Sequence, residues 1–197
     1  EFDETSGQAC AQAIAQAGGQ ARFVATDVTS RESVAALMEQ AGPVDILVNN
    51  AWQGSGIARI EEKTDDQFER ALRFGVFACQ WTMKAAFAHM KTQGWGRIVN
   101  LASLNGVNAH MGSADYNAAK EALRALTRTA AREWARYGIC ANIICPAAMA
   151  ASTRRIMAQQ PGMIERIEGA NPMGRMGDPE ADIAPVAVFL ASDDARY

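Results

Sequence analysis

The sequence predicts an α/β protein in which parallel strands form a doubly wound sheet with helices on both faces. Short apolar runs of strand length alternate along the chain with longer helical patterns, and most of the connections are short. The run at residues 44–49 is apolar with almost no alternation, as expected for a parallel strand that is buried on both faces. We therefore expect a single domain with ligands bound beyond the carboxyl ends of the strands.

Length, composition and charge restrict the class of protein. The chain has 197 residues, 49% of them apolar and 21% charged, which is ordinary for a globular domain with a substantial core. The formal net charge is −3 and no dense Lys/Arg stripe is present, so we expect no nucleic-acid partner. No apolar run approaches about 20 residues and no signal peptide is visible, so we expect no membrane partner and a cytoplasmic location.

In the first half of the chain, glycines end the helical patterns. The Ala/Gln-rich pattern near the start stops at Gly18, and the helix that Ser30 caps stops at Gly42. We expect, in order, a helix at residues 6–17, a short strand at 22–26, a helix at 30–40, a buried strand at 44–49 and a long helix at 65–91.

The second half continues the alternation. We expect a strand at residues 97–102, a helix at 113–137, a strand at 139–145, an irregular stretch at 147–175 and a helix at 178–190. Asp178 and Pro179 are typical of the N-cap and first position of that last helix. Right-handed crossovers then place the carboxyl ends of the strands at one edge of the sheet, with these residues on it: Asp27, Asn49, Asn50, Ser103 and Pro146.

The cysteines and histidines do not form a recognisable metal site. No CxxC pair occurs, and His89 and His110 are the only histidines. We therefore expect no metal, and we expect free, buried thiols in a reducing compartment at Cys10, Cys79, Cys140 and Cys145.

Tyr116 and Lys120 carry the clearest chemical signal. They lie four residues apart in a predicted helix and so share a face, and Ser103 ends the strand shortly before that helix. An ammonium beside a phenol favours the phenolate, which lowers the pKa from about 10 toward neutrality. Such a cluster suits carbonyl reduction or alcohol oxidation, with a cofactor supplying hydride. A surface tyrosine packed on a lysine stem is an equal alternative for the isolated pair.

Several short motifs together resemble the short-chain dehydrogenase/reductase family, in its simple single-domain form. They occur in the family's order and spacing over nearly the whole chain: Asp-Val at 27–28, Leu-Val-Asn-Asn-Ala at 47–51, Gly-Arg-Ile-Val-Asn-Leu-Ala-Ser at 96–103, Tyr-Asn-Ala-Ala-Lys at 116–120, Cys-Pro at 145–146, Gly-Arg-Met-Gly-Asp-Pro-Glu at 174–180 and Phe-Leu-Ala-Ser at 189–192. The resemblance implies a Rossmann-like NAD(P)-binding domain over residues 1–197, incomplete at both ends.

The resemblance also implies roles for individual residues. The catalytic group would be Ser103, Tyr116 and Lys120, with Lys120 also holding the nicotinamide ribose. The other cofactor-binding positions would be Asp27 and Val28 beside the adenine, Asn50 and Ala51 in the cleft, and Pro146 to Met149 along the carboxamide. The cofactor would be NAD or NADP, and the acidic Glu1 near the expected end of the second family strand slightly favours NAD.

The glycine-rich phosphate loop of the family is not found in this sequence. Gly54 and Gly56 follow the wrong strand to replace it. In the family a first strand, its helix and a second strand would precede Glu1, and one further strand would follow Tyr197. Without a helix N-terminus to hold the pyrophosphate, we expect residues 1–197 alone to bind NAD(H) or NADP(H) weakly.

Three further positions depart from the family pattern. Trp52 stands where glycine is usual, and its ring either narrows the active-site mouth or packs on Ile57. Leu72 takes the place of an asparagine that anchors a water beside the lysine, and Ala147 replaces the glycine after Pro146. These departures leave two readings: an oxidoreductase acting on a carbonyl/alcohol pair, or a catalytically inert relative that serves as a subunit or binding module.

Partners and substrate are less closely defined by the sequence. The irregular segment is rich in methionine, which is typical either of a lid over an apolar substrate or of residues that fill gaps in the core. We expect a small-molecule carbonyl or alcohol substrate. Apolar residues on more than one face of the helices at 65–91 and 113–137 indicate a homo-dimer or homotetramer, as in the family.

Overall fold

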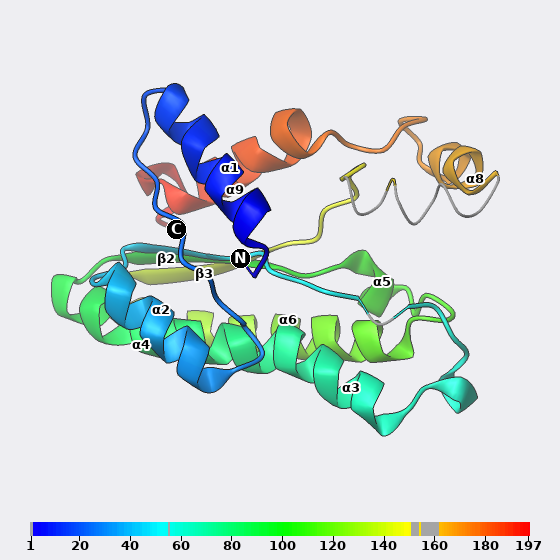
Figure 1. The fold of residues 1–197 in the computed structure, drawn as a ribbon, viewed down its shortest axis with the longest axis horizontal. Helices are drawn as coiled ribbons and strands as arrows, with labels where there is room; N and C mark the ends of the chain where they lie inside the picture. Colours follow the sequence, from blue (N-terminus) through cyan, green and yellow to red (C-terminus); the bar gives the residue numbers. More distant parts are fainter. Residues whose placement is uncertain (1, 55, 151–153, 155–161) are drawn as a thin grey trace.

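The computed structural model describes residues 2–54, 56–150, 154 and 162–197, and within them three strands form one parallel sheet. The strands are β1 (Ile46–Asn49), β2 (Gly96–Leu101) and β3 (Ile139–Ile144), in the order β1-β2-β3 (Figure 1). β2 is the central strand, with Ile98 and Val99 fully buried. The prediction that residues 44–49 form a strand buried on both faces is wrong, because β1 lies at the edge of the described sheet. The prediction of a doubly wound parallel α/β fold is confirmed for this sheet.

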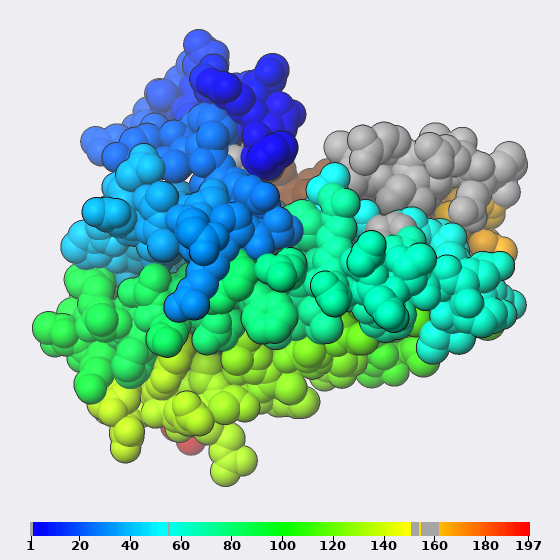
Figure 2. All heavy atoms as spheres, turned by 60° about the horizontal axis from the view of Figure 1, so that its bottom comes forward, coloured from blue at the N-terminus to red at the C-terminus, as the bar shows by residue number. Residues whose placement is uncertain are grey.

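Helices lie on both sides of the sheet (Figure 1). One side carries α2 (Arg31–Ala41), α3 (Asp65–Leu72), α4 (Ala78–Gln93) and α6 (Ala114–Trp134), and the other carries α1 (Glu4–Gln16) and α9 (Ala184–Ala191). Figure 2 brings the first side forward and shows α2, α3, α4 and α6 as one continuous surface. The shorter helices are α5 (Leu104–Val107) and α8 (Met163–Ala170).

The main core lies between the sheet and the helices α4 and α6. Met83, Met90, Ile98, Leu123 and Ile139 belong to it, and each is at most 2% exposed. The other face of the sheet, which carries α1 and α9, is covered less completely, since Ile46 and Val48 of β1 are 46% and 47% exposed. On the described residues, the sheet is therefore anchored mainly through α4 and α6.

The predicted boundaries follow from recognisable caps. The hydroxyl of Ser30 accepts a hydrogen bond from the backbone N–H of Ser33, and Gly42 ends α2 with a positive φ of 72°. Asp3 caps α1 in the same way through the backbone N–H of Thr5, so that this helix begins slightly earlier than predicted.

Four predicted elements differ from the structure. Residues 22–26 form no strand, because in the described part of the chain no neighbouring strand exchanges ladder hydrogen bonds with them. The long helix predicted at 65–91 is interrupted by a π turn, η2 (Arg73–Phe77), and the last helix begins with another, η4 (Pro179–Ile183). The stretch predicted to be irregular contains α8.

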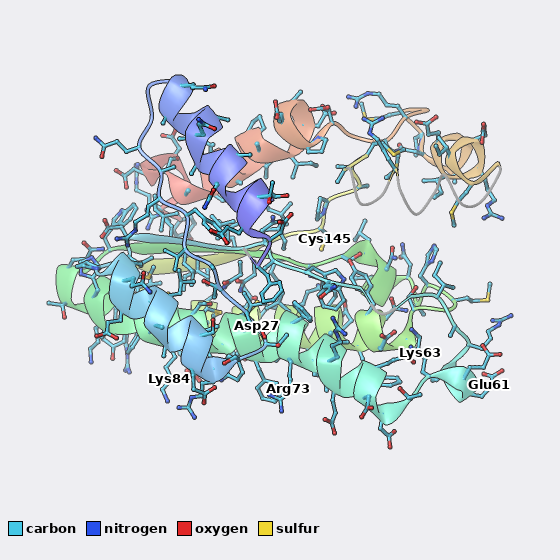
Figure 3. All side chains as sticks on the ribbon, viewed as in Figure 1. Asp27, Glu61, Lys63, Arg73, Lys84 and Cys145 are labelled. Atoms are coloured by element: carbon cyan, nitrogen blue, oxygen red, sulfur yellow. The ribbon has the colours of Figure 1, made fainter. Side chains whose placement is uncertain are left out.

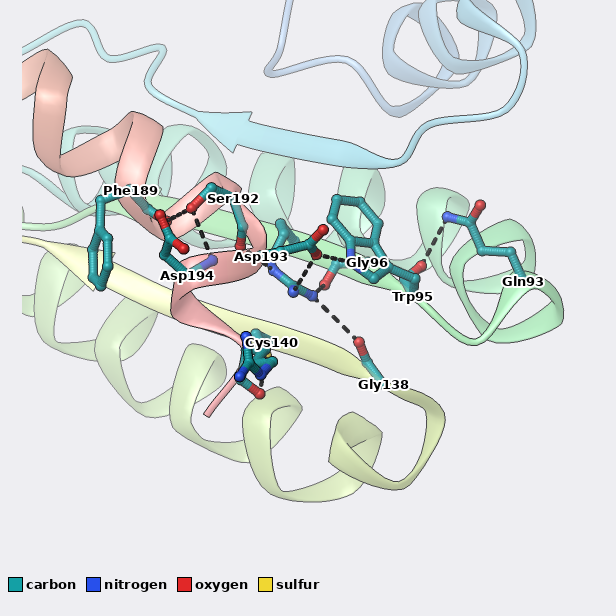
Figure 4. A network of polar contacts seen from close by, with 11 residues as sticks. Gln93, Trp95, Gly96, Gly138, Cys140, Phe189, Ser192, Asp193 and Asp194 are labelled. Atoms are coloured by element: carbon teal, nitrogen blue, oxygen red, sulfur yellow. Dashed lines mark hydrogen bonds and ion pairs between the residues drawn. The ribbon is translucent and has the colours of Figure 1, made fainter.

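Arg97 connects the beginning of β2 to the C-terminal segment. Figure 4 shows Trp95 beside Ser192 and Asp193 in the same network. Its guanidinium is 2% exposed, lies 4.4 Å from the centre of the Trp95 ring and donates to the carbonyl of Ser192 at 3.1 Å. The Trp95 indole donates to Asp193 at 2.8 Å, within the turn η5 (Asp193–Ala195). These contacts hold α9 against the end of the sheet opposite to Ser103.

Among the helices of the described residues, none has both the length and the apolar character needed to span a membrane.

Candidate active site

Ser103 stands where β2 gives way to a short helix. β2 ends at Leu101, and Ser103 is the N-cap of α5, its hydroxyl accepting a hydrogen bond from the backbone N–H of Asn105 at 3.1 Å. The residue is 8% exposed, so its hydroxyl lies in a largely desolvated place. The predicted strand end and the cap thus fix the hydroxyl at the carboxyl edge of the sheet.

Tyr116 and Lys120 lie one turn apart in α6 and reach the same edge. The Lys120 ammonium donates to the carbonyl of Leu101 at 2.7 Å and is 5.7 Å from the centre of the Tyr116 ring. Lys120 is 5% exposed, and a hydrogen bond links the side chains of Ser103 and Tyr116. The structure therefore brings hydroxyl, phenol and ammonium together at this edge of the sheet.

The pKa of Tyr116 differs in direction from the sequence-based expectation. Burial raises it above its ordinary value, and the hydrogen bond with Ser103 only partly opposes this rise. The expected lowering by Lys120 is absent because the ammonium is directed to the Leu101 carbonyl rather than to the phenol oxygen. In this unliganded arrangement the phenol keeps its proton at neutral pH.

Burial also perturbs Lys120. Its pKa falls from an ordinary value of 10.5 to about 8, because desolvation disfavours the ammonium. The group is still predominantly charged at pH 7, as a donor to substrate or cofactor hydroxyls must be.

Trp52 packs into the site instead of on Ile57. Its ring meets the Tyr116 ring edge-on, with centroids 4.9 Å apart, and its centre lies 4.7 Å from the Lys120 ammonium. Gly75 makes room for it, since an added Cβ there would lie 3.1 Å from Cζ3 of Trp52 and 2.9 Å from the Cβ of Ala119. The first of the two alternatives for Trp52, a ring at the active-site mouth, fits this position.

The π turn next to Leu72 is a feature that the periodicity did not predict. Leu72 is the last residue of α3, and the turn that follows carries Gly75 toward α6. π turns inside helices occur frequently at functional sites. The glycine in the middle of a helical pattern is the one sequence signal for it.

A buried ion pair fixes the loop that carries Trp52 to the helix that carries Tyr116. Lys63 and Asp115 are 2.9 Å apart with side chains 0% and 1% exposed, and Lys63 also donates to the carbonyl of Gly56 at 2.8 Å. Neither residue was predicted from the sequence. Asp115 is an acid in the first turn of a helix, and such an acid is ordinarily exposed and interacts with the helix dipole.

Buried amides and hydroxyls support the site from below. Asn100, in the centre of β2, accepts from the side-chain amide of Asn49 and donates to the hydroxyl of Thr127, both at 2.8 Å. Thr82 of α4 donates to Asn49 at 2.8 Å. The network ties β1, β2, α4 and α6 together directly beneath the carboxyl edge of the sheet.

Asp27 borders a surface groove between its own loop and α3. Figure 3 shows it next to Arg73, and both line a groove of about 450 Å³ together with Thr29, Gln53, Arg70 and Phe74, among others. The Asp27 carboxylate accepts from the backbone N–H and the hydroxyl of Thr29 at 2.9 and 2.7 Å. The groove connects the Asp27 loop to the loop that bears Trp52.

The other predicted cofactor residues are spread along the edge. Val28 is half-buried, Asn50 and Ala51 are exposed after β1, and Pro146 is half-buried after β3. Met149 donates its backbone N–H to the carbonyl of Gly177 at 2.8 Å. Glu1, the residue that favoured NAD, lies outside the described residues.

The thiols are free, but the expectation that they are buried is wrong for most of them. Only Cys79 is buried, and burial raises its pKa to about 11, whereas Cys140 and Cys145 are half-buried and Cys10 is exposed on α1. Within the described part of the chain, no group of three or more His, Cys, Asp or Glu side chains is placed to hold a metal ion.

The sheet, the edge cluster and the motifs define an oxidoreductase of the dinucleotide-binding type, and comparison with known proteins gives its family. A family model described as enoyl-(acyl carrier protein) reductase matches residues 1–197. The chain belongs to the short-chain dehydrogenase/reductase family, whose members act on CH–OH and C=O groups with nicotinamide cofactors.

Individual relatives agree with this assignment. A 12alpha-hydroxysteroid dehydrogenase of Clostridium sp. is 36% identical over 85% of this chain and 64% of its own length. The crystal structure of a gluconate 5-dehydrogenase from Burkholderia cenocepacia in complex with NADP and tartrate has a TM-score of 0.89 at 28% identity, over 100% of this chain and 78% of that one. An NAD+-bound xylitol dehydrogenase gives 0.88 at 30% identity, over 99% and 82%. The chain thus spans roughly two thirds to four fifths of the length of these relatives.

Proposed function

We propose that this protein is an NAD(P)-dependent oxidoreductase that interconverts an alcohol and a carbonyl compound, with Tyr116 as acid–base catalyst. The observation that carries the proposal is the convergence of Ser103, Tyr116 and Lys120 at the carboxyl edge of the sheet, where Ser103 caps α5, the Lys120 ammonium binds the Leu101 carbonyl and the centre of the Tyr116 ring lies 5.7 Å from that ammonium. Membership of the family supports it.

The residues at the edge suit a dinucleotide. The Lys120 ammonium has donors beyond the one that binds Leu101, as ribose hydroxyls require. Asp27 borders the groove and supplies a carboxylate acceptor, as an amino group of adenine requires. The bound cofactor would accept or supply the hydride, because no side chain can.

The protein side chains would handle the proton. Ser103 donates a hydrogen bond to the substrate oxygen and holds it beside Tyr116. Tyr116 then gives its proton to that oxygen in the reduction, or takes it in the oxidation. The raised pKa of Tyr116 favours the proton-donating direction unless Lys120 turns toward the phenol.

The proposed substrate is a secondary alcohol or the corresponding ketone. The relatives named for a hydroxysteroid, for gluconate and for xylitol differ widely in size and polarity but share the hydroxyl group. Met149, Met173 and Met176 belong to the segment that would border the substrate, and flexible methionine side chains suit an apolar compound. We further propose that the protein works in the cytoplasm as a homo-dimer or homotetramer.

Substitution of Tyr116 by Phe tests the proposal in the full-length protein. Loss of the phenol proton should reduce kcat by about 10²- to 10⁴-fold while the dissociation constant for NAD(H) or NADP(H) changes little. Steady-state kinetics with a panel of ketones and alcohols, together with calorimetric titration of the cofactor, measures both quantities.

Tyr137→Phe is the matched control, because Tyr137 packs beside Phe87 on the outer side of the helices and should leave kcat unchanged. A Tyr116→Phe enzyme that retains most of its kcat would rule out the acid–base role.

An inert binding subunit is the second candidate. Leu72 in place of the usual asparagine and Ala147 in place of the glycine after Pro146 favour it. This candidate predicts tight cofactor binding by the full-length protein without turnover of any compound in the panel.

A further inference from the structure

We propose that the Trp52 indole is a gate on the ribose site of the cofactor: it covers the Lys120 ammonium in the arrangement described above and is displaced when the nicotinamide half binds. This inference rests on the proposed function, because it takes Lys120 as the donor to the ribose hydroxyls. It adds a residue that controls access to that donor.

The closed position follows from the surroundings of the Lys120 ammonium. One N–H is used by the carbonyl of Leu101 at 2.7 Å, and the centre of the Trp52 ring lies 4.7 Å from the nitrogen. A hydroxyl oxygen placed between them needs about 2.8 Å from the nitrogen and about 3.4 Å from the ring, roughly 6 Å in all. The indole therefore occupies a place that a hydroxyl bound to Lys120 would take.

The same ring covers part of Tyr116. The two rings meet edge to face, with centroids 4.9 Å apart and planes at 76°. Gly75 leaves space for the indole, since a Cβ at this position would lie only 3.1 Å from Cζ3 of Trp52. Tyr116, Lys120 and Gly75 belong to α6 and to the π turn, so a single side chain from the loop after β1 bridges both elements.

The gate can be opened by a ligand. Trp52 is half-buried on the loop after β1. Its edge-on contact with Tyr116 and its cation–π contact with Lys120 should each shift the equilibrium between the packed and the displaced ring by a factor of roughly two to ten. A nucleotide that must displace the ring has a raised apparent dissociation constant, which equals the intrinsic constant divided by the fraction of molecules in which the ring is already displaced. Removing the ring should therefore tighten binding of the nicotinamide half and leave the adenosine half unaffected.

The test compares NADH with ADP, which lacks the nicotinamide ribose. In the full-length protein, Trp52→Ala should lower the dissociation constant for NADH by about five- to a hundredfold and leave that for ADP within about twofold. Trp52→Phe, with a smaller ring and a weaker cation–π contact, should lie between the wild type and Trp52→Ala. Trp95→Phe is the matched control, because Trp95 lies before β2 at the other end of the sheet and should change neither constant.

Indole fluorescence gives a second readout that does not depend on the folding of Trp52→Ala. Addition of NAD+ to the wild type and to Trp95→Phe should change the tryptophan emission, and the change should be lost in Trp52→Phe. NADH binding that is unchanged or weaker in Trp52→Ala, or an emission change that persists in Trp52→Phe, would overturn the gate while leaving the dehydrogenase proposal intact. A wild-type protein that binds none of NADH, NADPH and ADP would overturn both.

Discussion

At the scale of single residues, the ionisation of the site is set by burial more than by the neighbouring charge. Tyr116 and Lys120 share a helix face, yet the ammonium is directed to the Leu101 carbonyl and the pKa of the phenol rises. The pKa of Lys120 falls to about 8 for the same reason, because both groups lose water on folding. A bound ligand that draws the ammonium toward the phenol would change both values.

The lowered pKa of Lys120 predicts a distinctive pH dependence of stability. Between pH 8 and pH 10.5 the unfolded chain binds the proton more strongly than the folded chain does, so the wild type becomes relatively more stable as pH rises through this window. Lys120→Met removes this effect. The difference in unfolding free energy between variant and wild type should change by about 3 kcal/mol between pH 7 and pH 10.5, in favour of the wild type at high pH.

Chemical denaturation at a series of pH values measures this difference. Lys84→Met is the matched control, because Lys84 is exposed on α4 and points away from the sheet in Figure 3. Stability curves for Lys120→Met and the wild type that stay parallel across the window would show that Lys120 titrates normally.

At the scale of elements, the Lys63–Asp115 pair holds the Trp52 loop against α6, and it predicts a large effect on stability. Lys63→Met alone leaves the Asp115 carboxylate buried without this partner, and Asp115→Leu alone does the same to the Lys63 ammonium. Each change should lower the free energy of unfolding by about 3–5 kcal/mol, while the double variant should recover much of the loss. Urea unfolding of the four proteins gives the coupling energy.

The exposed pair of Arg124 and Glu121 provides the comparison for this experiment. Its side chains are 25% and 40% exposed, so Arg124→Ala should cost less than about 1 kcal/mol. If the Lys63 and Asp115 variants cost no more than this, the buried pair has no special role in holding the loop.

Elements whose signal is local were predictable from the sequence, and contacts between elements were not. β1, β2 and β3 follow from their strand-length apolar runs, and α6 from its helical pattern. Residues 22–26 have the composition of a strand, but a strand requires a partner, which composition does not reveal. The position of Trp52 depends on Gly75, which comes from a different element, and the pKa of Tyr116 depends on where Lys120 points.

At the scale of the whole molecule, the outer surface of α4 and α6 predicts self-association. Phe77 is 48% exposed and stacks on Trp81, and Phe87 lies between Trp134 and Tyr137 with ring centroids 4.7 and 5.7 Å away. The other four aromatic residues are half-buried, so part of each ring faces the surface. Aromatic side chains at the surface are enriched at interfaces between proteins. The full-length protein should sediment as a dimer or tetramer at micromolar concentration, with an interface above about 2,000 Å² in total.

Phe77→Glu tests the assignment of this surface and should shift the sedimentation toward the monomer. The control is Ile60→Glu, because Ile60 is 68% exposed on the turn η1 (Ile60–Glu62), away from α4. A wild-type protein that sediments as a monomer would contradict the prediction.

The π turn at Arg73–Phe77 determines how two surfaces of the molecule are oriented relative to each other. An α-helix advances by about 100° per residue, so one additional residue in a turn rotates everything beyond it by about that angle. Glu69 and Arg70 of α3 can therefore face the groove beside Asp27 while Met83 of α4 faces the core, although an uninterrupted helix would align these faces differently. Val76 lies in this turn and does not line the groove. Its deletion would rotate the groove side of α3 by about a quarter of a revolution relative to α4, and would so alter the ligand groove without removing any residue that lines it.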